Sequence, residues 1–335
     1  MKNIYFIAEI GVNHEADIKN AYKHILLAKK GGAQAVKLQS YKAEKIVSKH
    51  AKAYWDKAEE KENSQLKLYK KYDGFNDSDY MKIYDYCKKI KIDFIITPFD
   101  LDTIGFFKNK VKYFKISSSD ITNFPLIKKI STTNKPIILS TGASTKREVS
   151  DAIKLIEKKN KKITLLHCIL NYPTKKINAN LNMIDDLKTF NYNVGLSDHT
   201  KPKDSHEVLI YAYIKGVRVF EKHFTTNKKK RGNDHFHSFD YKDLKKFFNK
   251  IKEIDEILGH KKKEFLKSEI KSRRNARRSI FYKKSLKKNT TIQNSDLIML
   301  RPGTGLCPSK INSIVGKKLK KDKNEGDFVR SGDIK

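Results

Sequence analysis

The chain has 335 residues, 38% of them hydrophobic, and its 72 basic and 38 acidic residues give a formal net charge of +34 at pH 7. This length and apolar content predict one large domain with a small appendage and exclude a disordered chain. The N-terminal sequence reaches Glu9 too early for a signal peptide, and no apolar run of about 18 residues predicts a membrane span. We therefore expect no membrane partner.

The basic residues could indicate either a nucleic-acid-binding surface or a solvated surface rich in lysine. Only nine of them are arginine and 63 are lysine, spread along the whole chain. Arginine is the residue that recognition of phosphates and base edges favours, so this bias indicates a solvated surface and no nucleic-acid partner. A nucleic-acid-binding protein with RRNARRS, residues 273–279, as its basic patch is the non-enzymatic alternative.

Three cysteines, Cys87, Cys168 and Cys307, are odd in number and far apart. Such spacing does not indicate a disulfide framework and is typical of reduced thiols. We expect a cytoplasmic protein.

Short apolar runs alternate with amphipathic segments from the N-terminus onward. The runs are nearly continuous, as in parallel strands that are covered on both faces. They comprise residues 4–11, 33–39, 93–99, 113–117, 136–141, 163–168, 193–198 and 217–224. Amphipathic helical patterns include residues 20–30, 78–90, 146–159, 205–215 and 240–258. Eight strands, each followed by a helix, predict a (β/α)8 TIM barrel, an α/β fold, rather than a doubly wound sheet.

The rest of the chain lacks this regular alternation of apolar runs and amphipathic segments. Residues 40–76 form a long insertion after the second strand and carry the only tryptophan, Trp55; such loops commonly form walls or lids of active sites. Residues 259–278 are charged and predict a linker. Residues 279–335 alternate short β-like pieces with turns, which indicates a small β-rich domain. The expected organisation is a barrel over 1–258, a linker and this small domain.

All eight predicted strands end in polar residues. In a TIM barrel these ends meet at one rim, which is where the reactive groups lie. The candidates are Glu9, Lys37, Gln39, Thr97, Lys115, Ser118, Asp120, Ser140, Thr141, His167, Ser197, His199 and His223. A single polar strand end would indicate only exposure to solvent, whereas eight at one rim predict an active site. The lysines and hydroxyl groups are suited to holding a phosphate or carboxylate.

Two histidines, His199 and His223, end neighbouring strands. Either one alone is typical of a core residue, but the pair predicts a site for Mn²⁺, Mg²⁺ or Zn²⁺. His167 lies inside an apolar run, and we expect it to be structural. On the loop after the last strand, His235 and His237 flank Asp234, which we take as the functional member.

Nine motifs occur in order along the chain: AEIGVNHEAD, VKLQ, TPFD, FKISSSDITNFPLI, ILSTGAS, LLHC with NYPT, GLSDHT, EKHFT with GNDH, and RPGTGL. In this order and spacing they resemble the sialic acid (N-acetylneuraminate) synthase family, including its legionaminate and pseudaminate branches. The resemblance covers nearly the whole chain. Residues 279–335 are similar to the small antifreeze-like (SAF) domain that closes these enzymes.

The resemblance implies an enzyme that condenses phosphoenolpyruvate with the open-chain aldehyde of an N-acylated hexosamine, giving a nine-carbon 2-keto acid and phosphate. It implies a divalent metal, Mn²⁺ or Mg²⁺, bound by His199 and His223. The implied residues of the phosphoenolpyruvate site are Lys37, Thr97, Lys115, Ser118, Ser140 and Ser197. Those implied near the metal-bound water or the sugar are Glu9, Asn63, Asp120, Tyr172 and Asp234, of which Glu9, Asp120 and Asp234 are the catalytic candidates. Arg301 corresponds to an arginine that one subunit inserts into its partner's barrel, which implies a domain-swapped homodimer.

Two departures from the family pattern concern the sugar site. Ser119-Asp120 replaces the Gly-Glu of many relatives, and Ile169-Leu170-Asn171 replaces a Thr-Ser or Thr-Asn type of sequence. Either Asn171 supplies the polar contact that Leu170 cannot make, or the contact is absent. N-acetylneuraminate synthase activity is the first expectation, and a legionaminate or pseudaminate synthase using a 2,4-diacetamido-2,4,6-trideoxyhexose is the alternative. A synthase that acts on a phosphorylated aldose is a more distant one.

Overall fold

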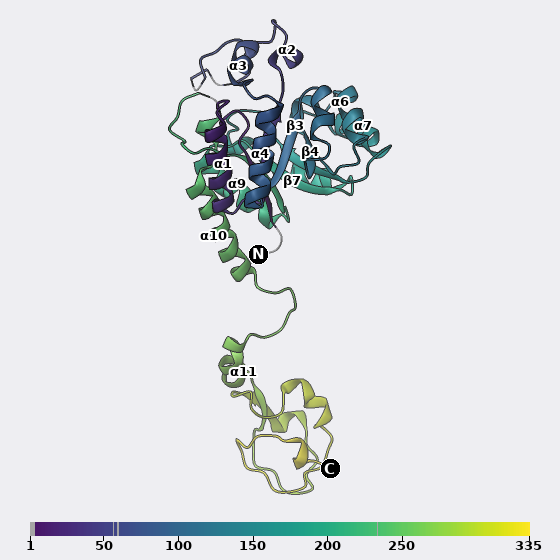
Figure 1. The fold of residues 1–335 in the computed structure, drawn as a ribbon. Coiled ribbons are helices and arrows are strands. Elements are labelled where there is room, and N and C mark those ends of the chain that lie inside the picture. Colours follow the sequence, from purple (N-terminus) through teal and green to yellow (C-terminus); the bar gives the residue numbers. More distant parts are fainter. Residues whose placement is uncertain (1–3, 56, 59, 233) are drawn as a thin grey trace. The chain divides into compact units, whose positions relative to one another are not determined.

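The computed structural model describes residues 4–55, 57, 58, 60–232 and 234–335. The chain forms two compact units, Met1–Gly259 and His260–Lys335 (Figure 1). The division falls next to residue 258, where the sequence predicts the barrel domain to end.

The first unit is a closed barrel of eight parallel strands. Each strand pairs with the next along the chain, and the last pairs with the first. The strands are β1 (Tyr5–Glu9), β2 (Ala35–Ser40), β3 (Asp93–Pro98), β4 (Tyr113–Ile116), β5 (Ile137–Ser140), β6 (Ile163–Cys168), β7 (Asn193–Asp198) and β8 (Val219–His223). The predicted (β/α)8 fold is confirmed, and the strand ends agree with the predicted apolar runs to within two residues.

Helices on the outside of the barrel bury their apolar faces against the strands (Figure 1). They are α1 (Ile18–Gly31), α4 (Asp77–Ile90), α5 (Asp102–Phe107), α6 (Phe124–Ser131), α7 (Lys146–Glu157), α8 (Met183–Lys188), α9 (Pro202–Ile214) and α10 (Tyr241–Leu258). Side chains at the N-termini, such as Asp17, Asn76, Thr145 and Asp240, accept hydrogen bonds from backbone N–H groups of the first turn. These caps set where each helix begins. The insertion after β2 adds α2 (Ala43–Ile46) and α3 (Gln65–Tyr72).

The interior of the barrel is apolar in its N-terminal half. The buried cluster there consists of Ile7, Ala35, Ile95, Ile138 and Leu166. On β7 the matching position is Gly195, where a Cβ atom would lie 2.5 Å from the Leu166 side chain, so glycine leaves the room that Leu166 fills. Because side chains alternate along a strand, the next inward position lies two residues further on. On each strand, the inward-facing residue that follows the apolar cluster therefore lies near the C-terminal rim of the barrel.

The second unit is small and β-rich. Strands β9 (Ser279–Tyr282) and β10 (Leu297–Leu300) pair antiparallel. Its core consists of Ile280, Tyr282, Leu286, Ile292, Leu297, Ile314, Leu319 and Val329. Helix α11 (Ile270–Ala276) lies in the segment for which the sequence predicts a linker. In the part of the chain that the structure describes, no helix combines the length and apolar composition that crossing a membrane requires.

Candidate active site

A ring of eight polar side chains, one from each strand, lies above the apolar interior of the barrel. Each member stands two residues after an inward-facing position of the N-terminal half, and all eight are buried. The members of this polar ring are Glu9, Lys37, Thr97, Lys115, Ser140, Cys168, Ser197 and Glu221. Alternation along eight parallel strands therefore brings two ammonium groups, two carboxylates, three hydroxyls and a thiol to one level of the barrel.

The charged members of the polar ring pair with one another. Lys37 forms an ion pair with Glu9 and donates to Thr97 Oγ1 at 3.2 Å. Lys115 Nζ donates to Ser140 Oγ at 2.6 Å and lies 3.7 Å from Glu221 Oε1. The two positive and two negative charges balance in the free protein.

Burial and pairing shift the pKa values of Glu221 and Lys115. Burial by itself would raise the pKa of Glu221, but Lys115, Lys37 and a hydrogen bond from Ser197 lower it to about 2. Glu221 is therefore anionic at neutral pH. Burial lowers the pKa of Lys115 further than Glu221 can restore it. A further negative charge close to Lys115 would stabilise this ammonium group, so an anion is favoured at the Lys115 position of the polar ring.

Beyond the polar ring the barrel opens into a cavity of about 580 Å³. Its described lining includes eight Phe, Tyr and Trp side chains: Tyr41, Tyr54, Trp55, Tyr69, Tyr72, Phe99, Tyr172 and Phe236. We refer to these eight residues as the aromatic wall. Five of them belong to the insertion at residues 40–76, so the insertion forms a side of the cavity, as the sequence predicts.

A histidine–aspartate cluster, His223, Asp234 and His237, lies at the same end of the barrel. One potential ligand atom from each residue lies within 4.8 Å of the other two. His223 Nδ1 is 3.1 Å from Asp234 Oδ2. The His199 ring is beside the cluster, with its centroid 5.3 Å from that of His223. His199 Nδ1 lies 2.9 Å from the Ile169 carbonyl oxygen, a hydrogen bond that leaves Nε2 as a ligand atom. Imidazole and carboxylate groups so arranged fit a divalent metal.

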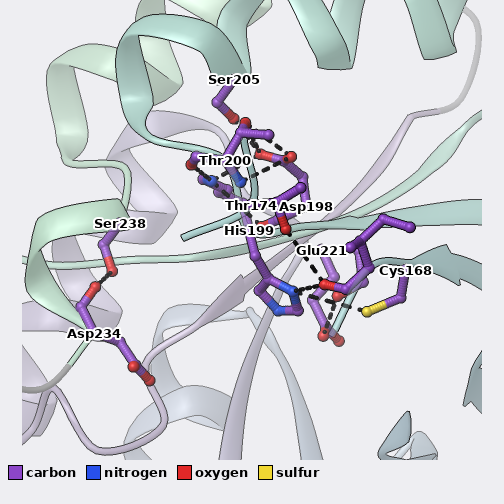
Figure 2. A network of polar contacts seen from close by, with 12 residues as sticks. Cys168, Thr174, Asp198, His199, Thr200, Ser205, Glu221, Asp234 and Ser238 are labelled. Atoms are coloured by element: carbon purple, nitrogen blue, oxygen red, sulfur yellow. Dashed lines mark hydrogen bonds and ion pairs between the residues drawn. The ribbon is translucent and has the colours of Figure 1, made fainter. Parts of the chain in front are cut away.

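A buried network holds the strand ends that carry these histidines (Figure 2). The Asp198 carboxylate accepts hydrogen bonds from Thr200 Oγ1 at 2.9 Å, Ser205 Oγ at 2.5 Å and Lys222 Nζ at 2.7 Å. Lys222 is completely buried. Because Lys222 points away from the barrel interior between Glu221 and His223, this ion pair joins the ends of β7 and β8 from outside. It fixes the direction in which His199 and His223 project.

Most of the residues predicted for the site line the cavity. They are Lys37, Thr97, Lys115, Ser118, Asp120, Ser140, Tyr172, Ser197, His199, His223 and Asp234. Asp120 accepts from Ser117 Oγ at 2.9 Å and from Asn123 Nδ2 at 3.1 Å, and burial raises its pKa nonetheless. Glu9 is not among the described residues that line the cavity, but its carboxylate pairs with Lys37, which does line it. Gly11 makes room for it, since a Cβ atom there would be 2.4 Å from Glu9 Oε1.

Asn63 and Arg301 are the remaining predicted residues. Asn63 is exposed, just before α3, and is not among the described residues that line the cavity. Arg301 is exposed on the second unit. In the Ile169–Asn171 segment, Leu170 lines the cavity whereas Asn171 is exposed. An apolar side chain thus occupies the place where the family pattern has a polar one.

Three residues that the sequence does not predict as functional also lie at the site: Cys168 and Glu221 in the polar ring and His237 in the histidine–aspartate cluster. Cys168 and Glu221 stand close to the predicted strand ends His167 and His223. Alternation was the available signal, because Glu221 stands two residues before His223 and must face the same side. His167 faces outward, with Nε2 2.8 Å from the Ala179 carbonyl oxygen, in the structural role predicted for it.

Two known protein families match the chain. Residues 24–263 match the NeuB family, and residues 277–335 match the SAF domain. The chain belongs to the NeuB family. The resemblance to sialic acid synthases drawn from nine motifs is thereby confirmed.

Curated relatives of this NeuB family member include two N,N'-diacetyllegionaminic acid synthases. The one from Campylobacter jejuni is 36% identical, over 98% of this chain and 100% of that protein. The one from Legionella pneumophila is 35% identical, over 96% of this chain and 92% of that protein. A solved structure of N-acetylneuraminic acid (sialic acid) synthetase from Leptospira borgpetersenii is 32% identical, with a TM-score of 0.71, and the match covers 81% of this chain and 90% of that one.

Proposed function

We propose that this chain is a nonulosonic acid synthase that condenses phosphoenolpyruvate with a 2,4-diacetamido-2,4,6-trideoxyhexose, giving a nine-carbon 2-keto acid and phosphate. The observation that carries the proposal is one cavity in which two buried lysines stand beside an imidazole–carboxylate cluster. The lysines suit the anionic substrate, and the cluster suits a metal that activates an aldehyde. The 35–36% identity to two legionaminic acid synthases supports the choice of sugar.

The polar ring would bind phosphoenolpyruvate through Lys37 and Lys115. The hydroxyl groups of Thr97 and Ser140 bond to the two ammonium groups, and Ser118 and Ser197 line the same cavity. All four would supply further hydrogen bonds to the phosphate and carboxylate. Glu9 and Glu221 keep the lysines charged before the substrate arrives. A trianionic substrate then adds the negative charge that the buried Lys115 lacks.

In the reaction, the vinyl carbon of phosphoenolpyruvate attacks the aldehyde carbon of the sugar and forms the new C–C bond. Positive charge develops at C2, water adds there, and the C–O bond to phosphate breaks to leave the 2-keto group. The Glu9 carboxylate would stabilise the charge at C2 and accept one proton of the added water, which then passes to the oxygen of the former aldehyde; the second proton of the water leaves on the phosphate. A divalent metal, Mn²⁺ or Mg²⁺, held by His199 and His223 near Asp234, would act as a Lewis acid on the aldehyde oxygen.

The aromatic wall supports an acceptor that is apolar and not phosphorylated. A second acetamido group and a 6-methyl group present apolar surface that aromatic side chains and Leu170 can cover. Among the described residues lining the cavity, Lys45 is the one cation of Lys or Arg type outside the polar ring, and it pairs with Asp102 at 2.5 Å. A sugar phosphate would lack the cluster of free cations that it needs.

We also propose a domain-swapped homodimer in which Arg301 completes the partner's site. Arg301 begins a Pro-Gly-Thr-Gly turn, a sequence suited to presenting one side chain at a tip. The exposed position of Arg301 on its own unit is compatible with this role.

The test is a panel of acceptors assayed for phosphate release from phosphoenolpyruvate with Mn²⁺. We expect kcat/KM for the 2,4-diacetamido-2,4,6-trideoxyhexose to exceed that for N-acetylmannosamine and its 6-phosphate by at least about tenfold, since each lost apolar group is worth about 1–3 kcal/mol. Preference for N-acetylmannosamine would contradict the choice of sugar. Phosphate release that EDTA does not reduce would contradict the metal.

A further inference from the structure

His237 is a buried histidine to which the described residues offer no hydrogen bond. Its ring is completely buried, and neither Nδ1 nor Nε2 bonds to any described residue. Leaving a buried polar group unsatisfied costs about 1–3 kcal/mol. A buried imidazole of this kind takes its partner from outside the protein, as a bound water or a metal ion does.

The groups around the His237 ring are of the kind that bind metal ions. Its ring centroid is 4.7 Å from that of His223 and 6.1 Å from that of His199. One of its nitrogens lies within 4.8 Å of a ligand nitrogen of His223 and a carboxylate oxygen of Asp234. Two imidazoles and a carboxylate thus converge on one point, and His199 adds a third ring at its edge.

The neighbouring His235 provides the contrast. It lies on the same loop and is also buried, but its Nδ1 is 2.7 Å from Thr225 Oγ1 and its Nε2 is 3.5 Å from Glu15 Oε1. His235 therefore has a structural role on the far side of the loop. Of the two histidines that flank Phe236, His237 alone faces the cluster without a polar partner among the described residues.

We propose that His237 is a direct ligand of the metal, alongside His223, Asp234 and His199, and that this nitrogen-rich set makes the site selective for transition metals such as Mn²⁺ over Mg²⁺. The proposal rests on the metal dependence of the proposed function. Mg²⁺ prefers oxygen ligands and keeps several of its waters, whereas imidazole favours first-row transition metals. Three imidazoles leave few positions for oxygen.

The experiment measures metal binding by the full chain without substrates. Free Mn²⁺ is quantified by electron paramagnetic resonance for the wild type, for His237→Phe, which keeps a buried aromatic ring, and for His235→Gln as the matched control. We expect His237→Phe to weaken Mn²⁺ binding at least about tenfold and His235→Gln to change it less than about twofold. Pulsed measurements of ¹⁴N couplings to bound Mn²⁺ should lose one coordinated imidazole in His237→Phe. Mg²⁺ should compete with Mn²⁺ only at about a hundredfold excess or more.

The outcomes separate this proposal from the proposed function. Unchanged Mn²⁺ affinity and ¹⁴N couplings in a folded His237→Phe protein would overturn the role of His237 and leave the synthase activity standing. A wild type that binds no Mn²⁺ would overturn both. Should His237→Phe fail to fold, His237→Cys decides the question, because a thiolate ligand would shift the preference from Mn²⁺ towards Cd²⁺ by at least about tenfold. No shift would count against ligation.

Discussion

Replacing Lys115 by methionine removes one of the two ammonium groups of the polar ring and keeps nearly the same length of apolar side chain. In the structure Lys115 Nζ lies 2.6 Å from Ser140 Oγ and 3.7 Å from Glu221 Oε1, so an anion bound at this level would approach it to a similar distance. At about 4 Å and an effective dielectric constant of about 20, the interaction with one negative charge is worth about 4 kcal/mol. Since about 1.4 kcal/mol corresponds to a factor of ten, phosphoenolpyruvate should bind about a thousandfold more weakly.

The assay is calorimetric titration with phosphoenolpyruvate in the absence of acceptor, together with kcat/KM for phosphate release. Lys45→Met is the matched control, because Lys45 lines the same cavity but its side chain is 48% exposed and pairs with Asp102 on the surface. Exposed pairs contribute about 0–1 kcal/mol, so this variant should stay within about fivefold of the wild type. A folded Lys115→Met protein that binds phosphoenolpyruvate as tightly as the control would refute the assignment of the polar ring to the anionic substrate.

Two further predictions concern stability and assembly. Lys222→Met leaves the Asp198 charge buried without its cation and should cost about 3–5 kcal/mol, which lowers the calorimetric Tm by about 6–20 °C for a unit of this size. Adding Asp198→Asn should recover part of that loss, and a double variant that is less stable than the single one would contradict the pairing. For assembly, Arg301→Ala and His199→Ala proteins, each inactive alone, should regain phosphate release on mixing, because a mixed dimer holds one intact site. Mixed dimers that form but stay inactive would exclude the swap.

The sequence by itself determined the architecture and the level at which the chemistry lies. Eight apolar runs separated by amphipathic segments permit few folds other than a closed parallel barrel, and the polar residue that ends each run marks the rim. Lys37, Lys115, His199 and His223 were found this way, and the structure brings their side chains into one cavity. These features are local, because a strand's period of two and a helix's period of 3.6 can be read within one segment.

Only the tertiary structure decided which side chains meet. Because the barrel closes, β1 pairs with β8 and Glu9 lies opposite His223, although the two residues are at opposite ends of the barrel sequence. Closure also brings Glu221 on β8 close to Lys115, which lies on a strand far earlier in the chain. The loop after β8 has no periodicity, so the sequence could not show that His235 turns towards Thr225 while His237 turns towards the cluster. In the same way Asn63, on an irregular insertion, proved to lie outside the cavity. A repeating backbone fixes the direction of a side chain from its position alone, whereas in a loop that direction depends on the packing of the whole fold.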